Sequence, residues 1–192
     1  IASYQMTKPI ANAKMQSEFV SDMELFYYTL GDKNNPPLVF LHGILAFTEA
    51  YKRFFTSLSD QFFIIGIDLP GHGNSPISKS TSFDSTIENL STLIKTFSHK
   101  NNTLIGYSLG GRIGLLLSLK YPELFKKIII ISAHPGLNCE SEKNQRNILD
   151  LSLSKKIITE PLLTFLENWY KNPIFSTFNT SQQFNTYLKS KL

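Results

Sequence analysis

Cysteine is almost absent from this sequence, and its scarcity excludes one whole class of protein. The single cysteine, Cys139, has no partner for an intramolecular disulfide, so a small secreted scaffold held together by disulfides is excluded. With 192 residues and 42% hydrophobic composition, the chain is long enough to bury a core without such cross-links. A reducing compartment is the simpler interpretation, and we expect Cys139 to be an ordinary thiol.

Long apolar runs and clustered charge are lacking as well. No stretch approaches the roughly 20 apolar residues that a membrane-spanning helix needs, and residues 1–17 contain no signal-peptide core. The net charge of +4 comes from scattered lysines and arginines, with no basic stripe between aromatic residues. The sequence therefore predicts no membrane span and no nucleic-acid partner. Because it begins with Ile1, we expect an initiator methionine upstream.

A serine flanked by glycines is the most informative motif that is present. The segment 106–111, G-Y-S-L-G-G, follows a short apolar run at 103–105 and opens into an apolar helical stretch at 112–120. Strand, tight turn and helix, with glycine two positions to either side of Ser108, are typical of a nucleophile elbow. Side chains at those two positions are expected to collide with the strained serine backbone. The helix that follows would direct its free N–H groups and its positive dipole end at the serine oxygen.

Apolar runs of strand length alternate with helical periodicity through most of the chain. The runs lie at 38–41, 62–67, 103–105 and 127–132. Residues 83–97 place apolar side chains at steps of four and three, as an amphipathic helix does, and Thr48 is expected to cap another helix over 51–58. Strands that are apolar on both faces and joined by helices form parallel sheets covered on both sides. The sequence thus predicts an α/β fold with a mostly parallel sheet.

The remainder of the chain is predicted to be a lead-in and a helical cap. We expect a polar lead-in or linker at 1–17, the α/β core at 18–137 and the cap at 138–192. No strand pattern interrupts the cap segment, so it is expected to hold three helices. These are predicted at 140–156, 160–170 and 181–192.

The predicted elbow lies at the carboxyl end of a strand. Ligands of open parallel sheets bind beyond these ends, so the active site is expected at that edge of the sheet. The loop after His42 ends at this edge, so the backbone N–H of Ile44 is expected opposite that of Leu109. Two such donors would form an oxyanion hole, commonly a contribution of a few kcal/mol to transition-state stabilisation. Ser108 would further need a histidine to take its proton and a carboxylate to orient that histidine.

The acid and the histidine of such a triad are not found in the expected order. In this architecture they follow the serine, the acid first, whereas His134 is the only histidine after Ser108. The carboxylate between them, Glu123, is expected at the opposite end of the sheet. His42 is expected to shape the oxyanion turn. The sequence therefore predicts that acid and base lie beyond Leu192, with His134 as the alternative base.

Arginines near the elbow indicate an acidic substrate. Arg112 lies one helical turn after Ser108, where its guanidinium would bind a substrate carboxylate through two hydrogen bonds. A solvated or salt-bridged arginine is the alternative. Arg146 and Trp169, in the cap segment, are ambiguous by themselves.

Five stretches of the sequence carry a family resemblance. They lie at 41–43, 68–75, 106–112, 134–137 and 168–175. Together they resemble the α/β-hydrolase superfamily and, within it, the 2-succinyl-6-hydroxy-2,4-cyclohexadiene-1-carboxylate synthases of menaquinone and phylloquinone biosynthesis. The more particular signals are the arginine four residues after Ser108, Pro-Gly-Leu after the next strand, and Trp-Tyr-x-x-Pro-x-Phe in the cap segment.

The resemblance implies an activity and a set of residue roles. Family members release pyruvate from 2-succinyl-5-enolpyruvyl-6-hydroxy-3-cyclohexene-1-carboxylate, with a serine that acts as base, and use no metal or organic cofactor. This implies a lyase acting on a small polycarboxylate in the cytoplasm, or in the plastid of a photosynthetic eukaryote. The implied roles are Ser108 as catalytic serine, Ile44 and Leu109 as backbone oxyanion donors, and Tyr107, Arg112, Arg146 and Trp169 as substrate-binding residues.

The sequence also departs from the family pattern. Ile44-Leu45-Ala46 stands where a bulky aromatic residue and a glycine are common, and the triad acid and histidine are missing. Three hypotheses stay open: the synthase, with its C-terminal part cut off or supplied by fusion or complementation; a carboxylic-ester hydrolase; and a non-catalytic remnant acting as a binding module. Arginines aimed at the site favour the first over the second. We expect the 192-residue chain by itself to be inactive.

Overall fold

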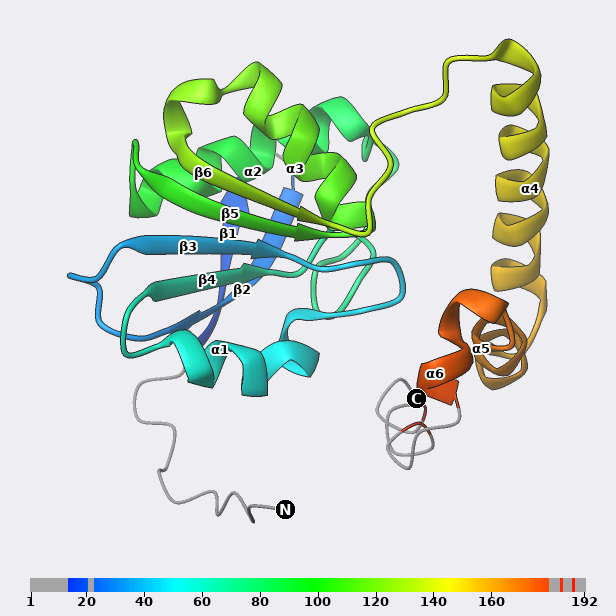
Figure 1. Ribbon diagram of the computed structural model, residues 1–192, viewed down its shortest axis with the longest axis horizontal. Helices are drawn as coiled ribbons and strands as arrows, with labels where there is room; N and C mark the ends of the chain where they lie inside the picture. Colours follow the sequence, from blue (N-terminus) through cyan, green and yellow to red (C-terminus); the bar gives the residue numbers. More distant parts are fainter. Residues whose placement is uncertain (1–13, 21–22, 180–183, 185–187, 189–192) are drawn as a thin grey trace. The chain divides into compact units, whose positions relative to one another are not determined.

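A six-stranded sheet in the order β1-β2-β4-β3-β5-β6 organises the first part of the chain (Figure 1). The computed structural model describes residues 14–20, 23–179, 184 and 188. Strands β3 to β6 run parallel, whereas β2 is antiparallel to both β1 and β4. The predicted α/β fold with a mostly parallel sheet is therefore confirmed. The strands are β1 (Lys14–Val20), β2 (Met23–Leu30), β3 (Pro37–Leu41), β4 (Phe63–Ile67), β5 (Asn102–Tyr107) and β6 (Phe125–Ile131).

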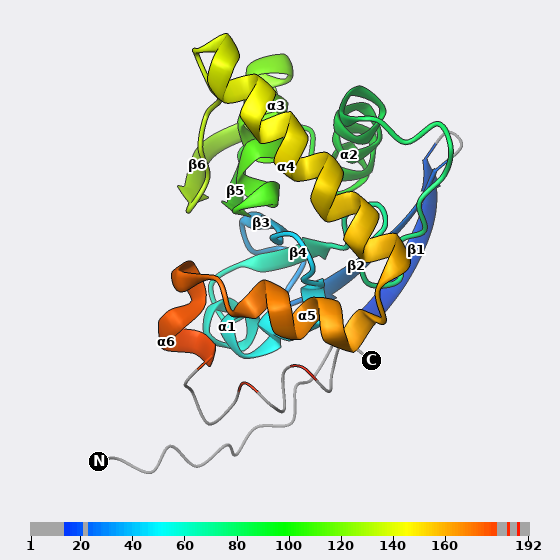
Figure 2. The same cartoon turned by 90° about the vertical axis from the view of Figure 1, so that its right-hand side faces the viewer.

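The hairpin of β1 and β2 corrects the predicted lead-in. Strand β1 begins at Lys14 and pairs along its length with β2, from Lys14 opposite Thr29 to Val20 opposite Met23 (Figure 2). The assignment of 14–17 to a lead-in or linker was therefore wrong, while residues 1–13 lie outside the described part. Pairing with a neighbouring strand supplies the backbone hydrogen bonds of β1, and the local composition of 14–17 carries no sign of that pairing.

Side chains of the central strands alternate between two hydrophobic cores. On one face Val39 and Leu41 of β3 pack with α2 (Phe83–Phe97) and α3 (Leu109–Lys120). On the other face Leu38 and Phe40 pack with Phe55 of α1 (Lys52–Leu58). Because successive side chains of a strand point to opposite faces, a wholly apolar strand is buried only when helices cover both sides, as they do here (Figure 1).

Strand β6 forms the edge of the described sheet on the side of β5. Its side chains Ile128, Ile129 and Ile131 are 38%, 40% and 42% exposed, whereas Ile65 and Leu104 of the inner strands are 0% exposed. The strand was predicted to be apolar on both faces, and it is. Within the described residues, however, its two faces are not buried as those of β3, β4 and β5 are.

The chain from Gly136 onward forms a second compact unit. Its described part contains helices without an intervening strand: α4 (Glu140–Thr159), α5 (Leu162–Tyr170), a 3-10 turn (Pro173–Phe175) and α6 (Ser176–Asn179). The helices predicted at 140–156 and 160–170 are confirmed, and the one predicted at 181–192 lies outside the described residues. Phe165, Leu166 and Tyr170 form the buried face of α5. That this unit caps the sheet stays a prediction.

Candidate active site

Ser108 occupies the sharp turn between β5 and α3. Its backbone has φ 53° and ψ −111°, a conformation that costs a non-glycine residue about 1–3 kcal/mol. Two backbone hydrogen bonds hold the turn: the Ser108 N–H donates to the Ile131 carbonyl oxygen (2.9 Å), and the Arg112 N–H donates to the Ser108 carbonyl oxygen (3.0 Å). The motif predicted this strained strand-to-helix turn, and the structure has it.

The flanking glycines allow backbone segments to approach each other closely. A Cβ on Gly110 would overlap the carbonyl oxygen of Leu41, and a Cβ on Gly106 would lie 2.5 Å from the carbonyl oxygen of Gly110. The expected collision with the serine backbone stays a prediction, since atoms of other residues are the nearest neighbours of both positions. The glycines let the first turn of α3 lie against β3 and β5, so that the Gly110 N–H reaches the His42 carbonyl oxygen (3.0 Å).

The loop after β3 borders the elbow at Gly43. A Cβ there would lie 2.9 Å from Cδ1 of Tyr107 and 3.3 Å from Cβ of Ser108. The N–H of the next residue, Ile44, has no acceptor among the described residues. Leu109 is the first residue of α3, where an N–H has no acceptor within its own helix. Both donors thus belong to segments that border Ser108, and their role as an oxyanion hole stays a prediction.

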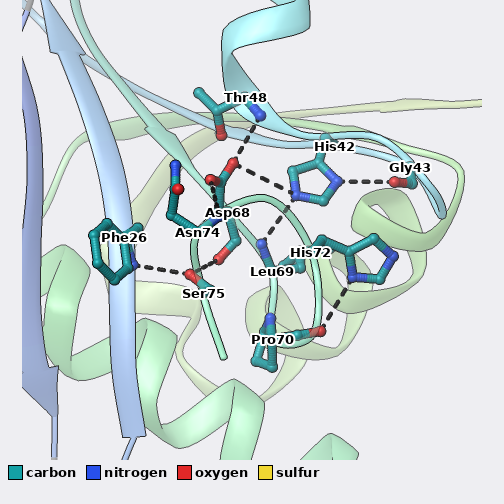
Figure 3. Close-up of polar contacts among 10 residues, drawn as sticks. All are labelled: Phe26, His42, Gly43, Thr48, Asp68, Leu69, Pro70, His72, Asn74 and Ser75. Carbon is teal, nitrogen blue, oxygen red and sulfur yellow. Dashed lines mark hydrogen bonds and ion pairs between the residues drawn. The ribbon is translucent and has the colours of Figure 1, made fainter. Parts of the chain in front are cut away.

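A buried polar network holds this loop, with the His42 ring at its centre (Figure 3). The ring is 0% exposed; its Nε2 accepts the Leu69 N–H at 3.0 Å, and its Nδ1 lies 2.8 Å from the Gly43 carbonyl oxygen. Because Nε2 accepts a hydrogen bond, we assign a neutral ring with the proton on Nδ1, which then donates to Gly43. Asp68 Oδ1, 4.0 Å from Nε2, is therefore a neighbour of a neutral ring and not one half of an ion pair.

Asp68 fixes the far end of the same loop. Its carboxylate is buried and accepts the Thr48 N–H at 2.7 Å and the Asn74 N–H at 3.0 Å. The Thr48 side chain was expected to cap a helix, and this was wrong: its hydroxyl is buried without a hydrogen-bond partner among the described residues, and a 3-10 turn (Thr48–Tyr51) precedes α1. A carboxylate 20 residues away satisfies the N–H at this helix start instead. Sequence reasoning missed Asp68, although the motif at 68–75 contains it.

Arg112 lies on α3 beside the elbow, as its spacing from Ser108 predicted. The side chain is exposed, and its Cζ lies 5.9 Å from the ring centre of Phe83, the first residue of α2. No carboxylate contacts Arg112 among the described residues, which leaves the salt-bridged alternative without support there. The other predicted substrate-binding residue of this unit, Tyr107, is half-buried against Gly43.

Arg146 and Trp169 belong to the second unit. Arg146, on α4, donates its Nε–H to both carboxylate oxygens of Asp150, at 2.8 and 2.9 Å, in an exposed pair. Trp169, on α5, stacks on Phe165 with ring centres 6.3 Å apart. It lines a hollow of about 440 Å³. The substrate-binding roles of Arg146 and Trp169 stay predictions.

A hollow in the first unit is not the candidate site. It measures about 510 Å³, and Pro37, Thr103 and Lys127 are among its lining residues. These residues lie at the amino-terminal ends of β3, β5 and β6, whereas ligands of parallel sheets bind at the carboxyl ends. The elbow at Ser108 lies at that other edge.

No hydrogen bond identified for the described residues joins the Ser108 hydroxyl to a histidine. His134 follows β6 and is exposed, and none of the hydrogen bonds among the described residues joins it to Ser108. The Nδ1 atom of His72 lies 3.1 Å from the Pro70 carbonyl oxygen, within its own loop. The group that would take the serine proton is therefore not identified by a hydrogen bond among the described residues. Whether acid and base lie beyond Leu192 stays a prediction.

The strained serine turn on a mostly parallel sheet, with helices on both faces, defines a class of protein. Residues 36–179, more than half of the chain, match the alpha/beta hydrolase fold family, and the chain belongs to this family. It is similar to the 2-succinyl-6-hydroxy-2,4-cyclohexadiene-1-carboxylate synthase of Escherichia coli O1:K1 / APEC, with 29% identity over 153 residues, 80% of this chain and 60% of that protein.

Two further relatives point the same way. Protein PHYLLO, chloroplastic, of Arabidopsis thaliana is 28% identical over 163 residues, 80% of this chain and 10% of that protein. The solved structure of MenH from S. aureus has a TM-score of 0.78 and 28% identity, over 87% of this chain and 64% of that chain. The resemblance to the synthases is thus confirmed. The chain spans about 60% of the length of the E. coli relative.

Neither a metal-binding cluster nor a membrane-spanning helix is found among the described residues. Among the described residues no group of three or more His, Cys, Asp or Glu side chains is arranged to hold a metal ion, and the expected independence of cofactors stays a prediction. None of the described helices combines the length and the apolar character that crossing a bilayer requires.

Proposed function

We propose that the complete gene product is a carbon–oxygen lyase that releases pyruvate from 2-succinyl-5-enolpyruvyl-6-hydroxy-3-cyclohexene-1-carboxylate. The observation that carries the proposal is the Ser108 elbow bordered by the Gly43 loop, with Arg112 one turn into α3. The identity of 29% with an enzyme named for the product of this reaction supports it.

The reaction in this proposal is a proton abstraction followed by elimination. Ser108 Oγ, relieved of its proton by a histidine outside the described residues, takes a proton from the substrate ring. The electrons of the broken C–H bond form a ring double bond, the C–O bond to the enolpyruvyl group breaks, and the departing enolate takes up a proton to become pyruvate. The N–H groups of Ile44 and Leu109 stabilise the negative charge that develops on a substrate oxygen, and the N-terminus of α3 favours the same charge.

Substrate recognition in this proposal depends on cationic and aromatic side chains. The planar guanidinium of Arg112 binds a substrate carboxylate through two charge-assisted hydrogen bonds. Tyr107 of the same unit, and Arg146 and Trp169 of the second unit, are further residues that we propose for substrate binding, each on the strength of the family resemblance. A neutral ester would not require the arginines.

A carboxylic-ester hydrolase with the same elbow is the second candidate. The solved structure of a putative lipase from Acinetobacter baumannii shares the fold, with a TM-score of 0.67 and 23% identity. That likeness concerns the fold alone. The third hypothesis, a non-catalytic binding module, would hold if the complete gene product supplied no base for Ser108.

The test compares two activities of the complete gene product. Pyruvate release from the adduct is followed by coupling to lactate dehydrogenase, and hydrolysis of short p-nitrophenyl esters is measured in parallel, with Ser108→Ala as the control. We expect Ser108-dependent pyruvate release and slow ester cleavage. Fast ester cleavage without pyruvate release would favour the hydrolase, and neither activity would favour the binding module.

A further inference from the structure

We propose that the loop at 68–75 sets the direction of the Ile44 N–H, and that it does so through the ring of His42. This inference rests on the proposed function, because it explains how the oxyanion donor of that reaction is held. His42 is then a positioning residue, since its ring acts on the reacting atoms only through the peptide that follows it.

The first step of the argument is the geometry of one peptide unit. The carbonyl of Gly43 and the N–H of Ile44 belong to the same planar trans peptide, so they point in opposite directions and turn together. The Gly43 carbonyl oxygen is held from two sides, by Nδ1–H of His42 at 2.8 Å and by the Ala46 N–H at 3.2 Å. The shorter of these two hydrogen bonds comes from His42, so the direction of the Ile44 N–H depends on that ring.

The second step concerns what fixes the His42 ring. The Leu69 N–H donates to Nε2 at 3.0 Å, which leaves the proton on Nδ1, where it donates to Gly43. In the other tautomer the proton is on Nε2, where it would face the Leu69 N–H. The lone pair of the bare Nδ1 would then face the lone pairs of the Gly43 carbonyl oxygen. The backbone N–H of Leu69 thus selects the tautomer that holds the oxyanion peptide.

The third step is the anchoring of the 68–75 loop itself. Ser75 donates its hydroxyl to the Asp68 carbonyl oxygen at 2.7 Å and accepts the Phe26 N–H from β2 at 2.9 Å (Figure 3). The Asp68 carboxylate holds Thr48, at the other end of the oxyanion loop, and a Cβ at position 73 would overlap that carboxylate. The loop that orients His42 is therefore tied to the sheet and to both ends of the segment it positions.

Two substitutions at His42 separate the two hydrogen bonds of its ring. In His42→Asn the side-chain NH₂ lies near the position of Nδ1 and still donates to Gly43, while the acceptor for Leu69 is lost. In His42→Gln the side-chain oxygen reaches the position of Nε2 and accepts from Leu69, while the donor to Gly43 is lost. Each variant loses one buried hydrogen bond, so a purely structural role for His42 predicts similar effects. His99→Gln, at an exposed histidine, is the control for the substitution itself.

The first readout does not depend on activity. In protein labelled with ¹⁵N-isoleucine and weakly aligned, the residual dipolar coupling of Ile44 reports the direction of its N–H, and melting temperatures report stability. We expect the coupling to change in His42→Gln and to stay close to the unmodified value in His42→Asn and His99→Gln. An unchanged Ile44 coupling in His42→Gln, or equal changes in the two His42 variants, would overturn the inference.

The second readout uses pyruvate release by the complete gene product. The Ile44 N–H is proposed to stabilise the transition state more than the bound substrate, so turning it away should chiefly affect kcat. His42→Gln is therefore expected to lower kcat by about 10- to 100-fold with little change in KM. His42→Asn is expected to keep most of kcat. If the unmodified protein releases no pyruvate, the proposed function fails, while the dipolar couplings still decide whether His42 directs the Ile44 peptide.

Discussion

At the scale of single residues, Arg112 is the direct test of substrate recognition. Arg112→Ala removes a charge-assisted contact with a substrate carboxylate and is expected to reduce kcat/KM by a factor equivalent to about 2–4 kcal/mol. Stability should change little because the side chain is exposed. Steady-state kinetics and a thermal melt of the complete gene product measure both effects. Arg112→Lys should recover little activity, since a point charge does not reproduce the planar fork; full activity of the alanine variant would make Arg112 an ordinary surface residue.

Cys139 was expected to be an ordinary thiol, and its surroundings correct that expectation. A hydrogen bond with the Ser141 hydroxyl, assisted by the N–H groups of Glu142 and Ser141, lowers the pKa of the exposed Cys139 thiol. Because the thiolate is the reactive form, alkylation by iodoacetamide should reach half its maximal rate at a lower pH than for free cysteine. Ser141→Ala should move that midpoint back up. Identical pH profiles for the two proteins would show that Ser141 has no such influence.

Tyr28 has a buried hydroxyl without a partner among the described residues. Burial, and to a smaller extent the charge of Glu49, raises the pKa of Tyr28. Tyr28→Phe keeps the stacking on Phe55, with ring centres 6.0 Å apart, and removes the unsatisfied group, so we expect a gain of about 1 kcal/mol in urea unfolding at neutral pH. Above the pKa of an unfolded tyrosine the phenolate favours unfolding, and the advantage of phenylalanine should grow. A loss of stability in the phenylalanine variant at both pH values would contradict this account.

At the scale of elements, the close approach of α3 to β3 depends on Gly110. Gly110→Ala brings a Cβ into the Leu41 carbonyl oxygen, which is backbone and does not move aside, so a loss of about 2–4 kcal/mol is expected. Gly114→Ala, in the same helix, is the matched control. Its Cβ would lie 3.0 Å from Cδ2 of Leu104, the end of a flexible side chain, and a gain in helix propensity of up to about 1 kcal/mol offsets the contact. Urea unfolding of the two variants measures the difference, and equal stabilities would show that the approach is not tight.

At the scale of the whole molecule, we expect the edge strand β6 to govern behaviour in solution. Its apolar side chains, and an edge that pairs with no further strand among the described residues, invite association. The purified 192-residue chain is therefore expected to self-associate, to bind a hydrophobic dye and to release no pyruvate. Ile129→Lys should reduce association, whereas Ile77→Lys, at an isoleucine that is 71% exposed and outside the sheet, should not. Light scattering and dye fluorescence are the measurements. A monodisperse, fully active 192-residue protein would refute the prediction and return His134 as the candidate base.

Much of the architecture could be predicted because its signals are local. The runs at 38–41 and 62–67 are apolar at every position, and a strand with that pattern is stable only between two layers of helices. The steps of four and three at 83–97 predicted α2 with its observed ends. The order of strand, Ser108 and helix predicted the strained turn, because the constraint on the backbone acts within a few residues.

Other features could not be predicted, because they depend on contacts between groups far apart in the chain. The Asp68 carboxylate meets Thr48 across 20 residues, and the Leu69 N–H meets the His42 ring across 27. The second contact selects the tautomer of a buried histidine, a choice that no local pattern encodes. Residues 14–17 became a strand only by pairing with β2, and β6 differs from β5 in exposure because of its place at the edge. The spacing of residues along the chain determined the elbow at Ser108. Hydrogen bonds between distant loops decided how the loop that carries the Ile44 N–H is held beside it.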